Sequence, residues 1–177
     1  MNSFIRITSG TFKGRSLSTP GGKTHPMGER ERLALFNMIV DYVPGSTVLD
    51  AFSGSGALGI EALSRGAKSV FFIEKNRDAC QTITKSLETL GVEKEKYEVI
   101  KGDVYEFCKN ANDKWGVVLA DPPYDEFNTD IIQVLAKMVA PRGVLVLSHP
   151  GETPEMPGLT LEKSRKYAGA TLSVYSA

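Results

Sequence analysis

Short apolar runs alternate with helical patterns along most of the chain after residue 46. The apolar runs are rich in Val, Ile, Leu and Phe, as are strands that are buried on both faces of a sheet. Such alternation is typical of an α/β fold in which helices cover both faces of a mostly parallel sheet. The strands that this pattern predicts are Thr47 to Ala51, Ser69 to Glu74, Tyr97 to Lys101, Trp115 to Ala120 and Gly143 to His149.

Four helices are predicted from apolar positions at helical spacing and from residues that favour helix ends. One covers about 28–42, before the first strand, and the next runs from Ala57 to about Gly66. A third begins after Asn76 and ends at Gly91, and a fourth covers about 127–140. We interpret the apolar stripes of these helices as core positions.

Two segments do not follow this alternation of strand and helix. Residues 3–19 have apolar positions on both sides of Ser9-Gly10, which predicts a β-hairpin. Residues 159–165 and 171–175 flank a turn at Gly169 and are predicted to end the sheet in antiparallel fashion. We therefore expect one domain over 1–177, in which an N-terminal hairpin arm (1–27) precedes an α/β core (28–177).

Composition narrows the class of protein. The chain has 177 residues, 41% of them hydrophobic and 24% charged, which suits a single globular domain. It has no signal-peptide pattern and no window near the ~18 apolar residues of a membrane span, so a cytoplasmic, soluble protein is expected. Cys80 and Cys108 lack a CxxC or Cys/His pattern, which predicts reduced packing residues and no metal site.

Charge is unevenly distributed although the formal net charge is zero. Residues 1–28 contain no Asp or Glu, so their four basic residues give this stretch +4 and leave the rest of the chain at −4. The asymmetry favours a basic arm near an anionic partner, while solvated loop charges are the plainer interpretation. The four basic residues are Arg6, Lys13, Arg15 and Lys23.

A glycine-rich loop joins the first predicted core strand to its helix. The sequence from Asp50 to Gly59 contains GxGxxG, a pattern that lets backbone approach a ligand closely. In a dinucleotide enzyme this loop binds pyrophosphate, and Glu74 would take the ribose hydroxyls. Asp50 favours another ligand, because a carboxylate there repels pyrophosphate but accepts hydrogen bonds from the ammonium of S-adenosylmethionine. The alternative for Asp50 is a residue that caps the loop.

Further polar residues follow the later strands. Asp103, in Gly102-Asp103-Val104, lies where ligands of open α/β folds bind and is a candidate acceptor for an adenine amino group. A helix N-cap would have the same sequence. Glu61 and Arg65 are spaced i,i+4 on a helix, and we interpret them as a surface ion pair outside the site.

The most informative motif is Asp121-Pro122-Pro123-Tyr124, at the end of the fourth core strand. Two consecutive prolines fix a rigid, extended turn at the sheet edge. An exocyclic amino group of a base is a poor nucleophile. Methyl transfer to its nitrogen therefore needs hydrogen-bond acceptors that direct the nitrogen lone pair toward the methyl donor. The Asp121 carboxylate and the Pro122 carbonyl can accept its two hydrogens, and Tyr124 can stack on an extruded base.

Together these motifs resemble the class I methyltransferases with a D/N-P-P-Y/F/W motif, and more closely the bacterial RsmD-type 16S rRNA guanine-N2 methyltransferase family. The resemblance covers nearly the whole chain and includes Arg6 to Gly10 with Lys13-Gly14-Arg15, Ala34 to Asn37, Ser55 to Ala67, and Asp121 to Tyr124. It departs at His25-Pro26-Met27, where the family has Arg-Pro-Thr, and at Leu33, where the family has Glu.

The resemblance implies a Rossmann-like, seven-stranded fold with an antiparallel last strand, S-adenosylmethionine as methyl donor, and a guanine amino group of 16S rRNA as acceptor, within a small-subunit particle. Separately, we expect a monomer and a mechanism that uses no metal. Catalysis is expected from Asp121 to Tyr124, and RNA contacts from Arg6, Lys13, Arg15 and Lys23. Cofactor contacts are expected from Asp50, Ala51, Phe52, Ser53, Gly54, Gly56, Glu74, Asp103, Val104 and Asp121.

Three other functions stay open from sequence. An adenine N6-methyltransferase would use the same Asp-Pro-Pro-Tyr motif. A nucleotide-binding oxidoreductase would explain the glycine-rich loop and Glu74 but leave Asp50 and Asp121 to Tyr124 unexplained. A non-catalytic RNA-binding assembly factor would retain the fold alone. For the favoured enzyme we expect direct transfer, because neither cysteine lies in a motif suited to nucleophilic attack.

Overall fold

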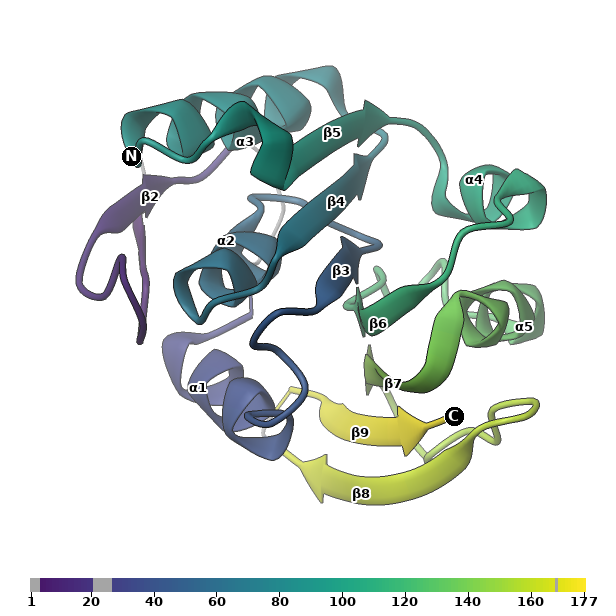
Figure 1. Cartoon of the computed structure of the whole chain (residues 1–177). Helices are drawn as coiled ribbons and strands as arrows, with labels where there is room; N and C mark the ends of the chain where they lie inside the picture. The colour runs from purple at the N-terminus through teal and green to yellow at the C-terminus, as the bar shows by residue number, and fades with distance from the viewer. Residues whose placement is uncertain (1–3, 21–26, 168) are drawn as a thin grey trace.

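The computed structural model describes residues 4–20, 27–167 and 169–177 as a helix-covered sheet with a separate N-terminal hairpin (Figure 1). The hairpin consists of β1 (Phe4–Arg6) and β2 (Ser16–Ser18). The main sheet contains β3 (Thr47–Asp50), β4 (Ser69–Glu74), β5 (Tyr97–Lys101), β6 (Trp115–Ala120), β7 (Val139–His149), β8 (Thr160–Lys166) and β9 (Thr171–Ser176). The helices are α1 (Glu29–Met38), α2 (Ala57–Ser64), α3 (Arg77–Thr89), α4 (Val104–Asn110) and α5 (Thr129–Lys137), with a short 3-10 turn at Lys94–Lys96.

The seven strands of the main sheet lie in the order β5-β4-β3-β6-β7-β9-β8. The first five in this order pair in parallel, whereas β9 is antiparallel to both β7 and β8. The chain leaves β3 toward β4 on one side and later returns to β6 on the other. This reversal creates a topological switch point at the carboxyl ends of β3 and β6, where open α/β sheets bind ligands.

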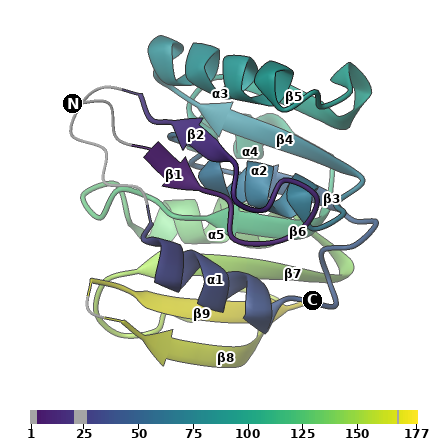
Figure 2. The ribbon, with the colours of Figure 1, turned by 90° about the vertical axis from the view of Figure 1, so that its left-hand side faces the viewer.

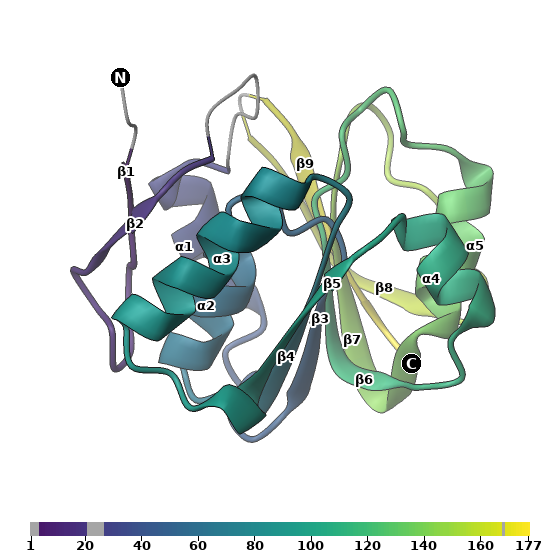
Figure 3. The same cartoon turned by 90° about the horizontal axis from the view of Figure 1, so that it is seen from above.

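Two layers of helices cover the sheet. Helices α1, α2 and α3 lie on one face and α4 and α5 on the other (Figure 3). Each face has its own apolar core. The expected α/β fold, with its seven-stranded sheet, antiparallel end and N-terminal hairpin, is therefore confirmed.

The single tryptophan lies in the core beneath α4 and α5. Trp115 is 2% exposed and begins β6, at the opposite end of that strand from Asp121. Its ring meets Phe71 edge-on at 5.7 Å between centroids and lies 6.0 Å from the ring of Phe107. These contacts hold the N-terminal edge of the sheet, away from the switch point.

Several element boundaries differ from the sequence expectation, and one helix had not been predicted as an element. Helix α1 ends at Met38, short of residue 42. Helix α4 had been foreseen only as an alternative role for Asp103, which indeed caps it. Strand β7 begins at Val139, four residues before the predicted start, because Val139 pairs with Trp115 ahead of an irregularity in register. Arg142 there has a φ of 64°, a conformation that the apolar pattern does not reveal.

The hairpin packs outside the helical layer, across α2 (Figures 2 and 3). Its inward side chains are apolar: Ile5 pairs with Leu17, and both are buried, as is Ile7. The hairpin is thus joined to the core by hydrophobic contact. Lys23, His25 and Pro26 lie outside the described residues.

Candidate functional site

A cavity of about 520 Å³ opens at the switch point, along the carboxyl edge of the parallel strands. It brings together the segments that follow four neighbouring strands, although these are far apart in sequence. Of the residues predicted to bind cofactor or to act in catalysis, those that line it are Phe52, Ser53, Gly54, Glu74, Asp103, Val104, Asp121, Pro122, Pro123 and Tyr124. Asp50, Ala51 and Gly56 are not among its lining residues.

The glycine-rich loop between β3 and α2 needs glycine for two different reasons. Gly54 and Gly56 have φ values of 51° and 77°, in the left-handed region that favours glycine. Gly59 instead lies close to the sheet, since a Cβ there would stand 2.2 Å from the ring of Phe72 on β4. The loop is closed by a hydrogen bond from the Gly56 N–H to the Ser53 carbonyl at 2.6 Å. These constraints hold the backbone of the loop against the cavity.

Asp50 lies beneath this loop and not on the cavity wall. It is 1% exposed, and its Oδ2 accepts a hydrogen bond from the Gly59 N–H at 2.8 Å. The structure therefore shows the capping role. Burial raises the pKa of Asp50 to about 7, the hydrogen bond from Gly59 opposes the shift, and the charges of Asp121 and Glu74 add to it.

Glu74, at the end of β4, fixes the loop from the other side. Its Oε2 accepts from the Gly54 N–H and its Oε1 from the Asn76 N–H, each at 2.8 Å. A carboxylate has about four acceptor sites, so both oxygens retain capacity for a ligand. Glu74 thus lines the cavity and also orders the loop.

Asp103 combines the two roles that its sequence had left open. Its Oδ1 accepts from the Glu106 N–H at 3.1 Å, which makes it the N-cap of α4. The same residue also lines the cavity. The capping bond uses one carboxylate oxygen and leaves the other without a capping role.

The Asp121–Tyr124 segment forms the edge of the cavity after β6. Burial raises the pKa of the Asp121 carboxyl, and a hydrogen bond with Ser148 opposes the shift. Pro122 is buried, whereas Tyr124 is 47% exposed. Its hydroxyl donates to the Gly169 carbonyl. The segment therefore presents a partly desolvated carboxylate beside an accessible aromatic ring.

The cavity is also lined by residues that were not among the predicted site residues, and these include Thr19, Met27, Lys75 and Glu126. Lys75 follows Glu74 and forms an ion pair with Glu126, which lies beyond the Asp121–Tyr124 segment. The pair links the two halves of the site across 51 positions of sequence, so no local spacing signals it. Thr19 and Met27 come from the two sides of residues 20–26 and place the arm at the cavity.

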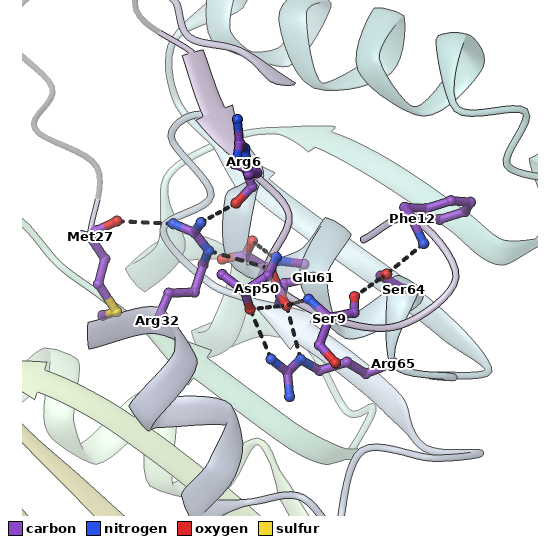
Figure 4. Close-up of polar contacts among 11 residues, drawn as sticks. Arg6, Ser9, Phe12, Met27, Arg32, Asp50, Glu61, Ser64 and Arg65 are labelled. Atoms are coloured by element: carbon purple, nitrogen blue, oxygen red, sulfur yellow. Dashed lines mark hydrogen bonds and ion pairs between the residues drawn. The ribbon is translucent and has the colours of Figure 1, made fainter. Parts of the chain in front are cut away.

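The interpretation of Glu61 and Arg65 as a surface pair was wrong. Glu61 is fully buried, because the hairpin covers the face of α2 that the helical pattern alone leaves open (Figure 4). Its carboxylate pairs with Arg65 Nε at 3.0 Å and with Arg32 Nε at 3.5 Å. It also accepts hydrogen bonds from Thr8 and Ser9.

The predicted RNA-binding residues within the described part of the chain lie on the arm. Arg6, Lys13 and Arg15 are exposed there, and Arg15 Nη2 lies 3.5 Å from the Thr89 carbonyl. Over 4–20, 27–167 and 169–177, no group of three or more His, Cys, Asp or Glu is arranged to hold a metal ion. Every helix in that part of the chain is too short or too polar to cross a membrane.

Known proteins are similar to this chain in both sequence and fold. "Putative rRNA methyltransferase YlbH" of Bacillus subtilis is 34% identical over 97% of this chain and 98% of its own. Ribosomal RNA small subunit methyltransferase D of Haemophilus influenzae is 38% identical over 68% of this chain and 64% of its own. The solved structure of "Putative methyltransferase yhhF" from Escherichia coli has a TM-score of 0.89 at 29% identity and covers 98% of both chains.

The sheet order and the cavity at its switch point define the fold of the class I methyltransferases, which use S-adenosylmethionine as methyl donor. The model of the family described as "Conserved hypothetical protein 95" matches residues 5–176. The chain belongs to this family, and the expected RsmD-type assignment is confirmed.

Proposed function

We propose that the protein transfers a methyl group from S-adenosylmethionine to the exocyclic N2 of a guanine in small-subunit rRNA. The observation that carries the proposal is the pairing of an acidic cavity with the Asp121–Tyr124 segment at its edge. We further propose that it acts as a single-domain monomer in the cytoplasm, on rRNA within a small-subunit particle. The names of the family relatives support the ribosomal substrate.

The charge of the cavity suits this cofactor. Its described lining includes four acidic residues, Glu74, Asp103, Asp121 and Glu126, against Lys75, which is paired with Glu126. A cationic ligand complements such a wall, whereas the pyrophosphate of a dinucleotide is repelled by it. Its volume of about 520 Å³ is also in the range of small-molecule sites. The acidic wall therefore favours S-adenosylmethionine over NAD.

Particular residues fit particular parts of the cofactor. Glu74 has free acceptor capacity for the ribose hydroxyls, and Asp103 for the adenine amino group. The loop backbone at Ser53 and Gly54 borders the same space. Asp50 lies beneath the loop, so its negative charge acts on a bound ammonium through the field of the site and through its hold on Gly59. When bound, the cofactor supplies an electrophilic methyl group on a sulfonium.

The chain's own residues prepare the acceptor. The Asp121 carboxylate and the Pro122 carbonyl accept the two hydrogens of the guanine amino group, which orients the nitrogen lone pair along the line of transfer. Burial at Asp121 strengthens this interaction by excluding competing water. After transfer, the nitrogen loses a proton along the same hydrogen bond to Asp121. Tyr124 stacks on the extruded base and keeps it at the cavity edge.

Radiolabelled methyl transfer to 16S rRNA and to small-subunit particles, followed by nucleoside analysis, tests the proposal. We expect N2-methylguanosine from the wild type and none from Asp121→Ala. Asp121→Ala should still bind S-adenosylhomocysteine, which shows that its fold is intact. N6-methyladenosine as the product, or binding of NADH without binding of S-adenosylmethionine, would contradict the proposal.

A further inference from the structure

Helix α2 bonds to the arm through the side chains of Glu61 and Ser64, and Arg65, at its C-terminal end, donates to the Thr8 hydroxyl at 2.9 Å (Figure 4). Glu61 accepts from the N–H groups of Thr8 and Ser9 at 2.9 and 3.0 Å, and also from the Thr8 hydroxyl. Ser64 Oγ donates to the Ser9 carbonyl and accepts from the Phe12 N–H at 2.9 Å. The turn of the hairpin is thus held by a helix that is buried along its whole length.

Arg32, on α1, holds the two ends of the arm. Its Nη2 donates to the Arg6 carbonyl and its Nη1 donates to the Met27 carbonyl at 3.1 Å. Arg32 is 1% exposed, and its remaining nitrogen, Nε, faces Glu61 at 3.5 Å without a hydrogen bond. One side chain therefore joins positions 6 and 27 to each other and to the carboxylate that holds the turn.

The arm contributes residues to the cavity wall and also carries exposed cations. Thr19 and Met27 line the cavity, as does Tyr124. Arg6, Lys13 and Arg15 are exposed on the same arm. A shift of the arm would consequently move a part of the cavity wall and the cations together.

We propose that Arg32, Glu61 and Ser64 are positioning residues that set the place of the arm relative to the cavity, so that RNA phosphates and the target base are engaged at once. We call these three residues the arm anchor. The inference rests on the proposed RNA substrate. These three side chains are buried and do not line the cavity. In this inference they affect RNA recognition through the backbone of the arm.

A purely structural role for the same cluster makes a different prediction. Breaking a buried ion pair destabilises the protein, which lowers the amount of active enzyme. Fewer active molecules lower the apparent kcat but leave the KM for RNA unchanged. A displaced arm instead raises the KM for RNA in the folded enzyme, because phosphate contacts are lost.

Two variants test the arm anchor without leaving a buried charge unpaired. Arg32→Lys keeps a positive charge near Glu61, but a single ammonium cannot match the planar fork that spans Arg6 and Met27. Ser64→Ala removes both side-chain bonds to the arm, keeps the bond from the Thr11 N–H to the carbonyl of residue 64, and changes no charge. Ser86→Ala is the matched control, since Ser86 is another buried helical serine, on α3, outside the arm anchor.

Two readouts are combined: amide hydrogen exchange over residues 8–12, and steady-state transfer to rRNA with KM and kcat determined separately. We expect faster exchange in both variants and a KM for RNA raised about tenfold in Arg32→Lys and about threefold in Ser64→Ala, with kcat within about twofold. Ser86→Ala should match the wild type in both readouts.

Unchanged exchange in both variants would overturn the arm anchor, whatever the wild type methylates. Faster exchange with an unchanged KM for RNA would overturn the positioning role and leave a structural one. A wild type that transfers no methyl group to any rRNA would instead count against the proposed function. The exchange experiment needs no RNA, so the two failures are distinguishable.

Discussion

The hydroxyl of Tyr124 donates a hydrogen bond to the carbonyl of Gly169 at 2.6 Å, across 45 positions of sequence. This bond ties the Asp121–Tyr124 segment after β6 to the turn between β8 and β9. The antiparallel end of the sheet thereby helps to hold an aromatic ring that is 47% exposed at the cavity edge. The ring and its hydroxyl have separable roles.

Exchange of Tyr124 for Phe or for Ala separates these roles. Tyr124→Phe keeps the stacking surface and loses one hydrogen bond, so we expect kcat/KM for RNA to fall about two- to tenfold. Tyr124→Ala also loses stacking, and the fall should reach about tenfold to a hundredfold. Steady-state transfer assays measure both. Equal losses in the two variants would show that the hydroxyl bond carries the whole effect.

Asp121→Asn should abolish most of the transfer while leaving cofactor binding nearly intact. The change removes a charged acceptor at the reacting nitrogen but preserves the shape of the side chain, so we expect kcat to fall about 100- to 1000-fold. Calorimetric affinity for S-adenosylhomocysteine should change less than about threefold. Asp125→Asn, at an exposed residue four positions later, is the control and should retain activity. Substantial transfer by Asp121→Asn would remove Asp121 from the mechanism.

Asp50→Asn should change how stability depends on pH. The pKa of Asp50 is about 7 in the folded protein and about 3.9 in an unfolded chain, so the folded state binds the proton more tightly. The wild type therefore loses stability as pH rises from about 4 to about 7, by at most about 1.4 kcal/mol per pH unit, and no further above that.

The asparagine variant lacks this titration. We expect thermal melting over the same pH range to show that the stability of the variant, relative to the wild type, rises up to about pH 7. Above that pH the difference in stability should be constant. A difference that is independent of pH would mean that Asp50 is already ionised throughout.

Gly10 and Gly14 form a matched pair within the hairpin. Both have positive φ, 81° and 82°. A Cβ at Gly10 would lie 1.8 Å from the Ser64 carbonyl oxygen, whereas a Cβ at Gly14 would have no neighbouring atom within 4 Å. Gly14→Ala should cost about 1–2 kcal/mol of unfolding free energy, from backbone strain alone. Gly10→Ala should cost about 1–3 kcal/mol more, because the arm must move off α2. Chemical denaturation measures both, and equal costs would show that the turn of the hairpin does not press on α2.

The local pattern of apolar and polar residues was sufficient to predict those elements that are determined by residues close in sequence. The strand from Trp115 to Ala120 was predicted with its observed bounds, and Asn76 caps α3 as expected. The place of Asp121 to Tyr124 at the cavity was also predictable, because these four consecutive residues directly follow a strand of the sheet. Such features depend on neighbours in sequence, which periodicity and motifs record.

Features made by distant partners were not predictable in this way. Glu61 has a spacing that suits a surface pair with Arg65, and only the hairpin, more than 50 positions away, buries it. Lys75 and Glu126 meet for the same reason, through the parallel crossover that brings β4 and β6 on either side of β3. Asp50 was expected to face the ligand, but a register that aims its Oδ2 at Gly59 puts it under the loop.

The burial of Trp115 has a practical consequence for the comparison of variants with the wild type. Because the only indole of the protein is packed against Phe71 and Phe107, away from the cavity, its fluorescence reports on the intactness of the sheet and not on occupancy of the site. Ligand titrations followed at other wavelengths can therefore carry an internal optical standard for folding, free of any added label.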